Sequence, residues 1–227
     1  MLLDRETERA LERAFTPYPV IRAGLGYALE LLAGDVAEAL RGDPDRPRIL
    51  DWCAGAGPWG RVAREIWPAA QITAVELVPS ERRYLARVAD HVLIGDWSLA
   101  LAAGPYELVI GNPAFSLLTA ARGRHPRSAP VLQLLRTAPI VIALHTIDVL
   151  QRSEAGRWIA RHRPPAVQID LPGGIQFYRE AGADSRSYAV YGWTHRHTGP
   201  GWLRVPLPHD LGPCERRWAA RPGTEMR

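Results

Sequence analysis

One short stretch, residues 48–60 (RILDWCAGAGPWG), constrains this chain most, because a brief apolar run there ends in an acid and a glycine-rich turn. Its Ile-Leu pair favours the end of a buried parallel strand, since such strands are covered on both faces. Gly55 and Gly57 begin a G-x-G-x-x-G spacing, in which missing side chains tighten a turn and let a ligand approach the backbone. Pro58 suits the first position of the following helix. The stretch therefore predicts a strand, a ligand-binding turn and a helix.

Two acidic residues indicate the ligand. Glu76 closes the next apolar run, QITAVE, where a carboxylate can accept hydrogen bonds from both ribose hydroxyls of a nucleoside. Asp51, four residues before Gly55, would repel the pyrophosphate of a dinucleotide. S-adenosylmethionine has no phosphate, and its ammonium is attracted to a partly exposed carboxylate by about 1 to 4 kcal/mol at ~4 Å. We therefore predict S-adenosylmethionine as the cofactor and expect no metal; from the glycine pattern alone, an ordinary strand-to-helix turn stays the alternative.

Two motifs resemble those of methyltransferases. The first is an Asp-x-Cys-x-Gly-x-Gly pattern, formed by Asp51, Cys53, Gly55 and Gly57. This pattern resembles the first cofactor motif of the amino-methyltransferases. A Phe-Thr-Pro segment ahead of an apolar helix resembles the N-terminal cofactor motif of adenine-specific methyltransferases, which packs over the methionine end of the cofactor; it comprises Phe15, Thr16 and Pro17. A plain helix boundary at Pro17 is the alternative.

Strand and helix patterns alternate along the chain, which predicts an α/β, Rossmann-like, seven-stranded methyltransferase sheet, mostly parallel with an antiparallel closing hairpin. We expect strands near 48–51, 72–76, 91–94, 107–111, 140–144, 167–171 and 188–193, and helices over 20–40, 58–67, 80–90, 129–135 and 148–161. Asp96 and Trp97 follow the third strand at the same crevice, where Asp96 would accept a hydrogen bond from the adenine amine and Trp97 would flank the ring. A helix N-cap for Asp96 and a core position for Trp97 are the alternatives.

The fourth strand delivers Asn112, Pro113, Ala114 and Phe115 beside the cofactor. This segment resembles the Asp/Asn/Ser-Pro-Pro-Tyr/Phe motif of methyltransferases that act on planar nitrogens. The resemblance implies that the Asn112 side chain and the Pro113 carbonyl accept hydrogen bonds from an exocyclic amine while Phe115 stacks on the base. Ala114 replaces the second proline, which predicts a looser site, and an inactive copy or a simple turn stays an alternative.

Positive charge gathers in the second half of the chain. All 28 basic residues are arginine; residues 1–120 hold 12 of them against 16 acids, and residues 121–227 hold 16 against 8. This asymmetry predicts an anionic partner. Arg122, Arg124 and Arg127 follow the catalytic motif closely and are candidates for clamping the phosphates beside an extruded base, although a solvated loop is the alternative.

Length and composition suit one domain in a reducing cytoplasm. We expect a methyltransferase domain over 1–195, with a helical cap over 1–45, and a basic tail containing Pro and Trp over 196–227 that is too short for a target-recognition domain. Two cysteines are too few for a disulfide framework, and no apolar run has the length of a membrane span.

A partial likeness to phage and prophage adenine methyltransferases covers about residues 15–195. Asp184, Ser185 and the segment 187–189 ahead of Trp193 carry this likeness. Together, the motifs predict an S-adenosylmethionine-dependent methyltransferase of the N6-adenine type that acts on DNA. Methyl transfer to RNA bases or to protein glutamine, and a non-catalytic nucleic-acid-binding module, remain alternatives.

Overall fold

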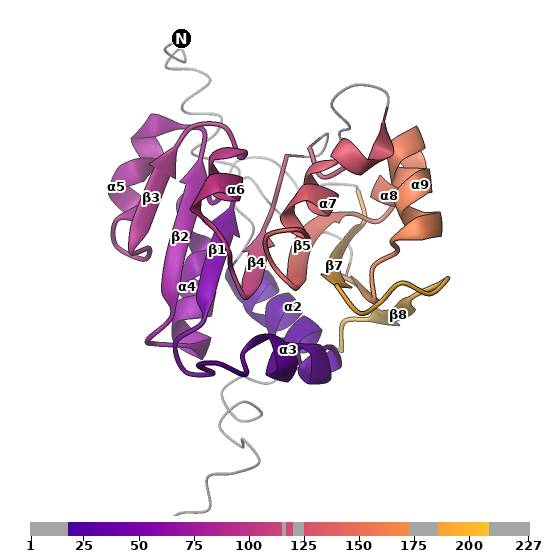
Figure 1. The fold of residues 1–227 in the computed structure, drawn as a ribbon, viewed down its shortest axis with the longest axis horizontal. Coiled ribbons are helices and arrows are strands. Elements are labelled where there is room, and N and C mark those ends of the chain that lie inside the picture. The colour runs from indigo at the N-terminus through magenta and orange to yellow at the C-terminus, as the bar shows by residue number, and fades with distance from the viewer. Residues whose placement is uncertain (1–17, 115–116, 120–124, 173–185, 209–227) are drawn as a thin grey trace, which may run out of the picture.

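A computed structural model describes residues 18–114, 117–119, 125–172 and 186–208 (Figure 1). Its centre is one sheet of eight strands in the order β3-β2-β1-β4-β5-β7-β6-β8. The strands are β1 (Arg48–Trp52), β2 (Gln71–Glu76), β3 (His91–Ile94), β4 (Leu108–Gly111), β5 (Ile140–Thr146), β6 (Val167–Asp170), β7 (Tyr188–Thr194) and β8 (Leu203–Pro206).

The strand directions confirm the predicted Rossmann-like sheet. β1 pairs in parallel with β2 on one side and with β4 on the other. β2 in turn pairs in parallel with β3, and β4 pairs in parallel with β5. β7 runs antiparallel to both β5 and β6, as the closing hairpin requires. The chain winds outward in opposite directions from β1 and β4, so a crevice is expected at the carboxyl ends of these two neighbours.

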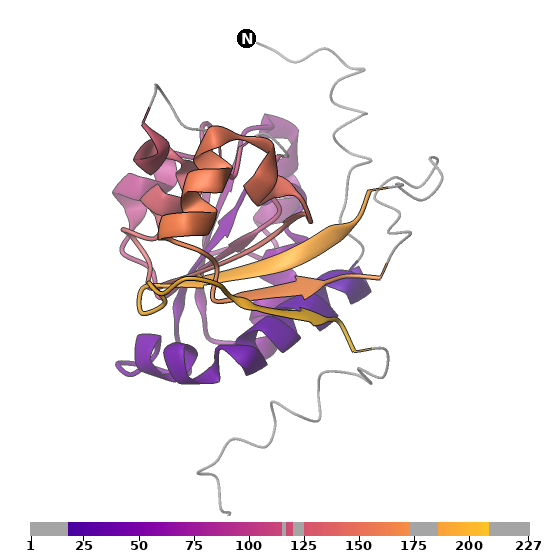
Figure 2. The same ribbon diagram turned by 90° about the vertical axis from the view of Figure 1, so that its right-hand side faces the viewer.

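Helices cover both faces of the sheet (Figure 2). One face packs against α2 (Tyr18–Leu31), α3 (Ala33–Ala39), α4 (Pro58–Ile66) and α5 (Arg82–Leu85); the other packs against α6 (Leu99–Ala103), α7 (Pro130–Leu134), α8 (Val149–Arg152) and α9 (Glu154–His162). Within the described ranges, no helix is both long and apolar enough to cross a membrane.

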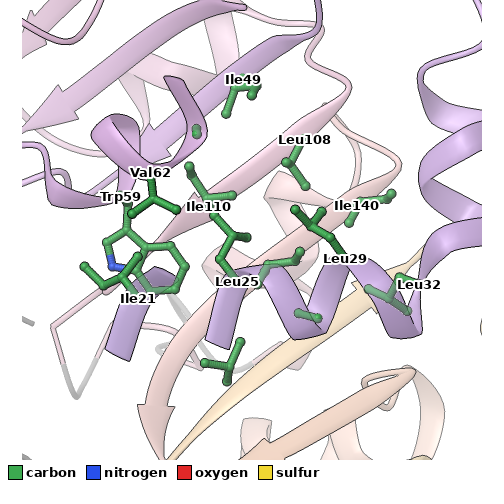
Figure 3. Close-up of a cluster of buried hydrophobic side chains, with 14 of the residues drawn as sticks. Ile21, Leu25, Leu29, Leu32, Ile49, Trp59, Val62, Leu108, Ile110 and Ile140 are labelled. Atoms are coloured by element: carbon green, nitrogen blue, oxygen red, sulfur yellow. The ribbon is translucent and has the colours of Figure 1, made fainter. Parts of the chain in front are cut away.

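In the larger core cluster on the first face, side chains of α2 pack against those of α4 and of the central strands (Figure 3). Ile21, Leu25 and Leu29 recur at helical spacing and are fully buried beside Ile110 of β4 and Ile140 of β5. Full burial of one such side chain stabilises the fold by about 1.5 to 3 kcal/mol. This packing fixes α2 across β4 and β5, and β4 leads into the predicted catalytic segment.

Three predicted helices are shorter or divided in the structure. The helix expected over 20–40 is divided between α2 and α3, and the one expected over 80–90 is reduced to a 3-10 turn (Pro79–Glu81) and α5. The helix expected over 148–161 is interrupted at Ser153, whose extended backbone ends α8. The Ser153 side chain accepts a hydrogen bond from the Gly156 N–H at 2.9 Å, so this residue caps α9 instead of continuing a single helix.

The sheet has eight strands and not the seven that the sequence predicts. β8 pairs in parallel with β6 and begins within the range expected to be a tail. Two side-chain contacts hold it: the Trp202 indole N–H donates to the Gln168 amide oxygen at 2.9 Å, and Arg204 Nε donates to Asp170 Oδ2 at 2.7 Å. The strand is short and mostly exposed, so no apolar alternation indicated it.

Candidate active site

Four neighbouring parallel strands end at the same edge of the sheet and bring most of the predicted site together. In the order β3-β2-β1-β4, their carboxyl ends carry Asp96, Glu76, Asp51 and Asn112. Because adjacent parallel strands share direction and register, these ends lie side by side. The predicted cofactor-binding and catalytic segments therefore lie along one edge of the sheet, where the reversal of strand order predicts a crevice.

The turn after β1 adopts the tight form that the glycines predict. Cys53, Gly55 and Gly57 all have positive φ, at 56°, 54° and 82°. The Gly57 N–H donates to the Ala54 carbonyl at 2.8 Å, and Gly57 is the N-cap of α4 with Pro58 as its first residue. A Cβ on Gly57 would lie 2.6 Å from Val88 Cγ2, so glycine is required both for the left-handed backbone and for space.

Asp51 is fully buried behind this turn. The N–H of Gly60 donates to its Oδ2 at 2.8 Å, which ties β1 to the first turn of α4. Its Oδ1 has no hydrogen-bond partner within the described part of the chain. Burial raises the pKa of Asp51 to about 8, the Gly60 hydrogen bond opposes this shift, and the negative charge of Glu76 adds to it. A cationic donor at Oδ1 would relieve this unfavourable burial.

Glu76 joins the ends of two strands. Gly55 donates its backbone N–H to Glu76 Oε2 at 2.7 Å, and Val78 donates to Oε1 at 2.9 Å. The carboxylate is buried, with 9% of the residue exposed. Each carboxylate oxygen has two lone pairs, so each can accept one further hydrogen bond. Glu76 therefore fixes the glycine turn and still has acceptor capacity for a diol.

The segment after β3 places Asp96 and Trp97 differently from each other. Asp96 is exposed, and its Oδ1 accepts a hydrogen bond from the Ser98 N–H at 3.0 Å, just before α6. Trp97 is only 7% exposed and meets Trp52 edge to face at a centroid distance of 6.2 Å. Asp96 thus accepts a hydrogen bond within a turn, and Trp97 packs in the core. The contacts of both residues with adenine stay a prediction.

The segment after β4 approaches the glycine turn closely. A Cβ on Gly111 would lie 2.1 Å from the Trp52 carbonyl oxygen, so only glycine permits this approach of β4 to β1. Asn112 follows half-buried, Pro113 is buried and Ala114 is exposed. The backbone N–H of Ala114 donates a hydrogen bond to the thiol of Cys53. The candidate catalytic segment and the candidate cofactor turn are thus in direct contact.

The environment of Cys53 keeps its thiol protonated. Burial raises its pKa well above the ordinary value, and the charges of Glu76 and Asp51 raise it further, outweighing the Ala114 hydrogen bond. A protonated, half-buried thiol is a weak acceptor and a poor nucleophile. Cys53 is therefore not a candidate nucleophile, and its contact with the cofactor stays a prediction.

Several predicted site residues lie outside the described residues: Phe15, Thr16, Pro17, Phe115, Arg122 and Arg124. Arg127 is described; it is exposed in a 3-10 turn (Pro126–Ser128) just before α7. Among the described residues, no group of three or more His, Cys, Asp and Glu side chains could hold a metal ion.

Sequence reasoning missed a second concave site, between α7 and α9. A cleft of about 540 Å³ there is lined by basic side chains, one tryptophan and two leucines; its polar and aromatic lining is Arg127, Arg136, Trp158, His162 and Arg163. The charge asymmetry pointed to this half of the chain. Of the lining residues, the sequence indicated only Arg127, because α7 and α9 are distant in sequence and no local pattern brings them together.

The fold and the strand-end site define a Rossmann-like α/β protein with the sheet of methyltransferases. No protein-family model and no curated protein matches the chain. A modification subunit assigned to a type I restriction enzyme from Vibrio vulnificus YJ016 matches with a TM-score of 0.54 at 13% identity, covering 86% of this chain and 48% of that one. A chain from a type I restriction-modification system matches with a TM-score of 0.54 at 16% identity, covering 88% of this chain and 46% of that one.

This chain spans about half the length of those two chains. A Pyrococcus horikoshii protein described as an RNA methyltransferase matches with a TM-score of 0.46 at 18% identity, covering 74% of this chain and 83% of that one. The likeness to the two chains with TM-scores of 0.54 shows a shared fold.

Proposed function

We propose that the protein is an S-adenosylmethionine-dependent methyltransferase that acts on the N6 amine of adenine in DNA. One observation carries this proposal: β1 and β4 pair in parallel with Trp52 opposite Gly111, so the segment that resembles a methyltransferase catalytic motif leaves the sheet beside the glycine turn that resembles a cofactor motif. A base held at Asn112 and a cofactor held at the turn would therefore meet in one crevice.

The residues of the crevice suit this cofactor. Asp51 Oδ1 is a buried acceptor without a partner within the described part of the chain, and a cofactor ammonium would supply the missing donor. Glu76 has acceptor capacity for two ribose hydroxyls. The two buried acidic side chains at adjacent strand ends present no positive charge to a pyrophosphate, which disfavours a dinucleotide. When bound, S-adenosylmethionine supplies an electrophilic methyl group on a sulfonium.

The chain's own residues would prepare the amine for attack. The lone pair of an exocyclic amine is delocalised into the ring, so the nitrogen must pyramidalise before it can act as a nucleophile. Asn112 Oδ1 and the Pro113 carbonyl would accept hydrogen bonds from the two N–H groups and hold the nitrogen in that form. These acceptors also stabilise the positive charge that develops on nitrogen during transfer. No general base with a shifted pKa is needed at this step.

DNA as the substrate is supported by charge and by fold. The second half of the chain carries 16 arginines against 8 acids, which suits a polyanion. The two matches with TM-scores of 0.54 come from type I restriction-modification systems. These observations make DNA the first substrate to test.

Mass spectrometry of digested DNA tests the proposal. Purified protein is incubated with saturating S-adenosylmethionine and either single-stranded or duplex DNA, and the nucleosides are analysed for N6-methyladenine. We expect methylated adenine with the natural protein and none above background with Asn112→Ala. If the natural protein yields none with either DNA, the DNA-adenine assignment fails. The same assay on RNA and on protein glutamine then decides between those substrates and a non-catalytic module.

A further inference from the structure

The cleft between α7 and α9 is strongly basic. Its lining includes three arginines and a histidine and no acidic residue. Within the described residues, Arg127, Arg136 and Arg163 make no ion pair, whereas Arg152 on the adjacent α8 pairs with Asp148 at 2.6 Å. Within the part of the chain that the structure describes, no carboxylate therefore neutralises the positive charge of these three side chains.

The arginines are spread along the cleft. Arg127 precedes α7 and Arg136 follows it, and the five residues of this helix span about 7.5 Å. Arg163 lies at the carboxyl end of α9, on the opposite wall. Separated cations match the successive charges of an extended polyanion better than they match one small anion.

An aromatic pair forms part of the same wall. The rings of Trp158 and His162 stack at a centroid distance of 4.5 Å and an interplanar angle of 19°. Trp158 is half-buried, and His162 is exposed. Planar aromatic surface beside arginines is the combination that single-stranded nucleic acid contacts with its bases and phosphates.

Hydrogen bonds connect the cleft to the candidate active site. The turn 117–119 follows the catalytic segment, and its Leu117 N–H donates to the Ala114 carbonyl at 2.7 Å. The Val131 N–H of α7 donates to the Leu118 carbonyl at 3.3 Å, and the Thr119 hydroxyl lies 3.3 Å from that of Ser153, the N-cap of α9. Both walls of the cleft are therefore attached to the turn that leaves the site.

We propose that this cleft binds the sugar-phosphate backbone of the DNA strand that flanks the target base. That the polyanion is DNA rests on the proposed function. That it binds in this cleft rests on the charge and shape of the cleft itself. Arg127 and Arg136 contact phosphates on one wall and Arg163 contacts them on the other. The cleft thus extends the substrate-binding surface from the active-site turn along α7 and α9.

Fluorescence anisotropy with a 20-nucleotide single-stranded DNA, titrated at several salt concentrations, tests this site. The variant Arg136→Gln with Arg163→Gln removes two cations from the cleft. We expect weaker binding and a slope of log affinity against log salt that is shallower by about 1.4, since each phosphate contact on a single strand contributes about 0.7. An RNA of the same sequence is titrated in parallel.

A matched control removes the same charge elsewhere. Arg46→Gln with Arg87→Gln changes two exposed arginines that lie outside the cleft, and this variant is expected to keep the natural slope. An unchanged slope in the cleft variant, or an equal loss in both variants, overturns the proposal. A change confined to the RNA titration overturns the assignment to DNA.

The outcome is separable from that of the proposed function, because cofactor binding and methyl transfer are measured on the same preparations. If the natural protein transfers no methyl group but the cleft variant loses salt-dependent DNA affinity, the proposed function fails and the cleft assignment stands. If the natural protein methylates DNA and the slope does not change, the cleft assignment fails alone.

Discussion

The backbone N–H of Ala114 donates a hydrogen bond to the thiol of Cys53, joining the segment after β4 to the turn after β1. A second proline at position 114, as in the methyltransferase motif that this segment resembles, has no N–H and cannot make this bond. The alanine therefore does more than loosen the segment, as the sequence alone suggested. It adds an attachment to Cys53, which lies between Asp51 and Gly55 in the turn after β1.

Ala114→Pro should lower methyl transfer in the natural background because it removes this attachment. A net hydrogen bond contributes about 0.5 to 1.5 kcal/mol, and sulfur is a weak acceptor, so we expect a loss of roughly 2- to 5-fold in kcat. In a Cys53→Ala background the same change should cost less, because the bond is already absent. A double-mutant cycle on kcat at saturating cofactor measures the coupling. Equal effects of Ala114→Pro in both backgrounds would show that the bond does not position the segment.

Glu76→Gln should weaken cofactor binding by roughly 1 to 3 kcal/mol in calorimetry. The amide keeps the shape of the side chain but replaces one carboxylate oxygen by an NH₂ group, next to backbone N–H donors at 2.7 and 2.9 Å. A donor then faces a donor, and an acceptor for the ribose is lost. Glu107→Gln, which changes a carboxylate paired with Arg48 at the start of β1, serves as the control and should leave cofactor affinity unchanged. Equal affinities for Glu76→Gln and the natural protein would remove Glu76 from the ribose site.

Cofactor affinity should rise with pH between about 5.5 and 7 because of Asp51. Its pKa of about 8 in the fold means that the carboxyl is mostly protonated in this range, whereas an ammonium favours the ionised form. Binding should therefore release a proton, and affinity should increase by up to roughly tenfold per pH unit. Calorimetry in two buffers of different ionisation enthalpy measures the release. Asp51→Asn should bind more weakly, with no pH dependence from this site.

The same pKa sets the pH dependence of stability in the cofactor-free protein. The folded state holds the Asp51 proton more tightly than the unfolded chain, whose Asp titrates near 3.8. The free energy of unfolding therefore decreases as pH rises from about 4 to about 8, and Asp51→Asn should flatten this decrease. A natural protein that becomes more stable over that interval, relative to Asp51→Asn, would contradict the raised pKa.

The strand ends could be predicted from sequence because they depend on local signals. A short apolar run followed by Gly55 and Gly57 specifies both the strand and the turn, and the acid that closes QITAVE lies at the end of β2 as expected. The contacts could not be predicted in this way. The bonds from Gly55 to Glu76 and from Ala114 to Cys53 depend on how strands separated by many residues pair, which no local pattern encodes.

Weak local signals explain the other differences. Ser153 interrupts a continuous helical pattern, because its side chain accepts a capping hydrogen bond from the Gly156 N–H. This bond stabilises an extended backbone at Ser153 more than helix propensity stabilises a helical one. β8 has too few buried residues to show alternation and is held by side-chain contacts with Gln168 and Asp170 on β6. Such contacts become visible only when the neighbouring strand is in place.

Gly111→Ala should destabilise the fold through both its backbone and its surroundings, because a φ of 159° is one that residues with a side chain rarely adopt. The added Cβ would lie 2.1 Å from the Trp52 carbonyl oxygen, which is backbone and cannot move without separating β4 from β1. We expect a loss of roughly 1 to 3 kcal/mol in the free energy of unfolding by urea denaturation. Gly34→Ala in α3 is the matched control, since nothing lies within 4 Å of its added Cβ. The control should be neutral or stabilising by up to about 1 kcal/mol; similar losses in both variants would argue against close approach as the cause.

Asn112→Ala should abolish most turnover and leave cofactor binding nearly intact. Asn112 is half-buried at the end of β4, beside the strand that carries Asp51, and is the residue whose side-chain oxygen is proposed to accept a hydrogen bond from the amine. This bond strengthens as positive charge develops on nitrogen, so its loss acts on the transition state more than on the bound ground state.

We expect the rate of a single turnover to fall by about 10²-fold or more in this variant, with a cofactor dissociation constant within about twofold of the natural value. Asn112→Asp is the informative companion, because it keeps the acceptor oxygen and also occurs at this position in the motif that the segment resembles; it should retain measurable activity. If Asn112→Ala turns over at the natural rate, Asn112 has no role in catalysis. A parallel loss of cofactor affinity would instead place this residue in the cofactor site.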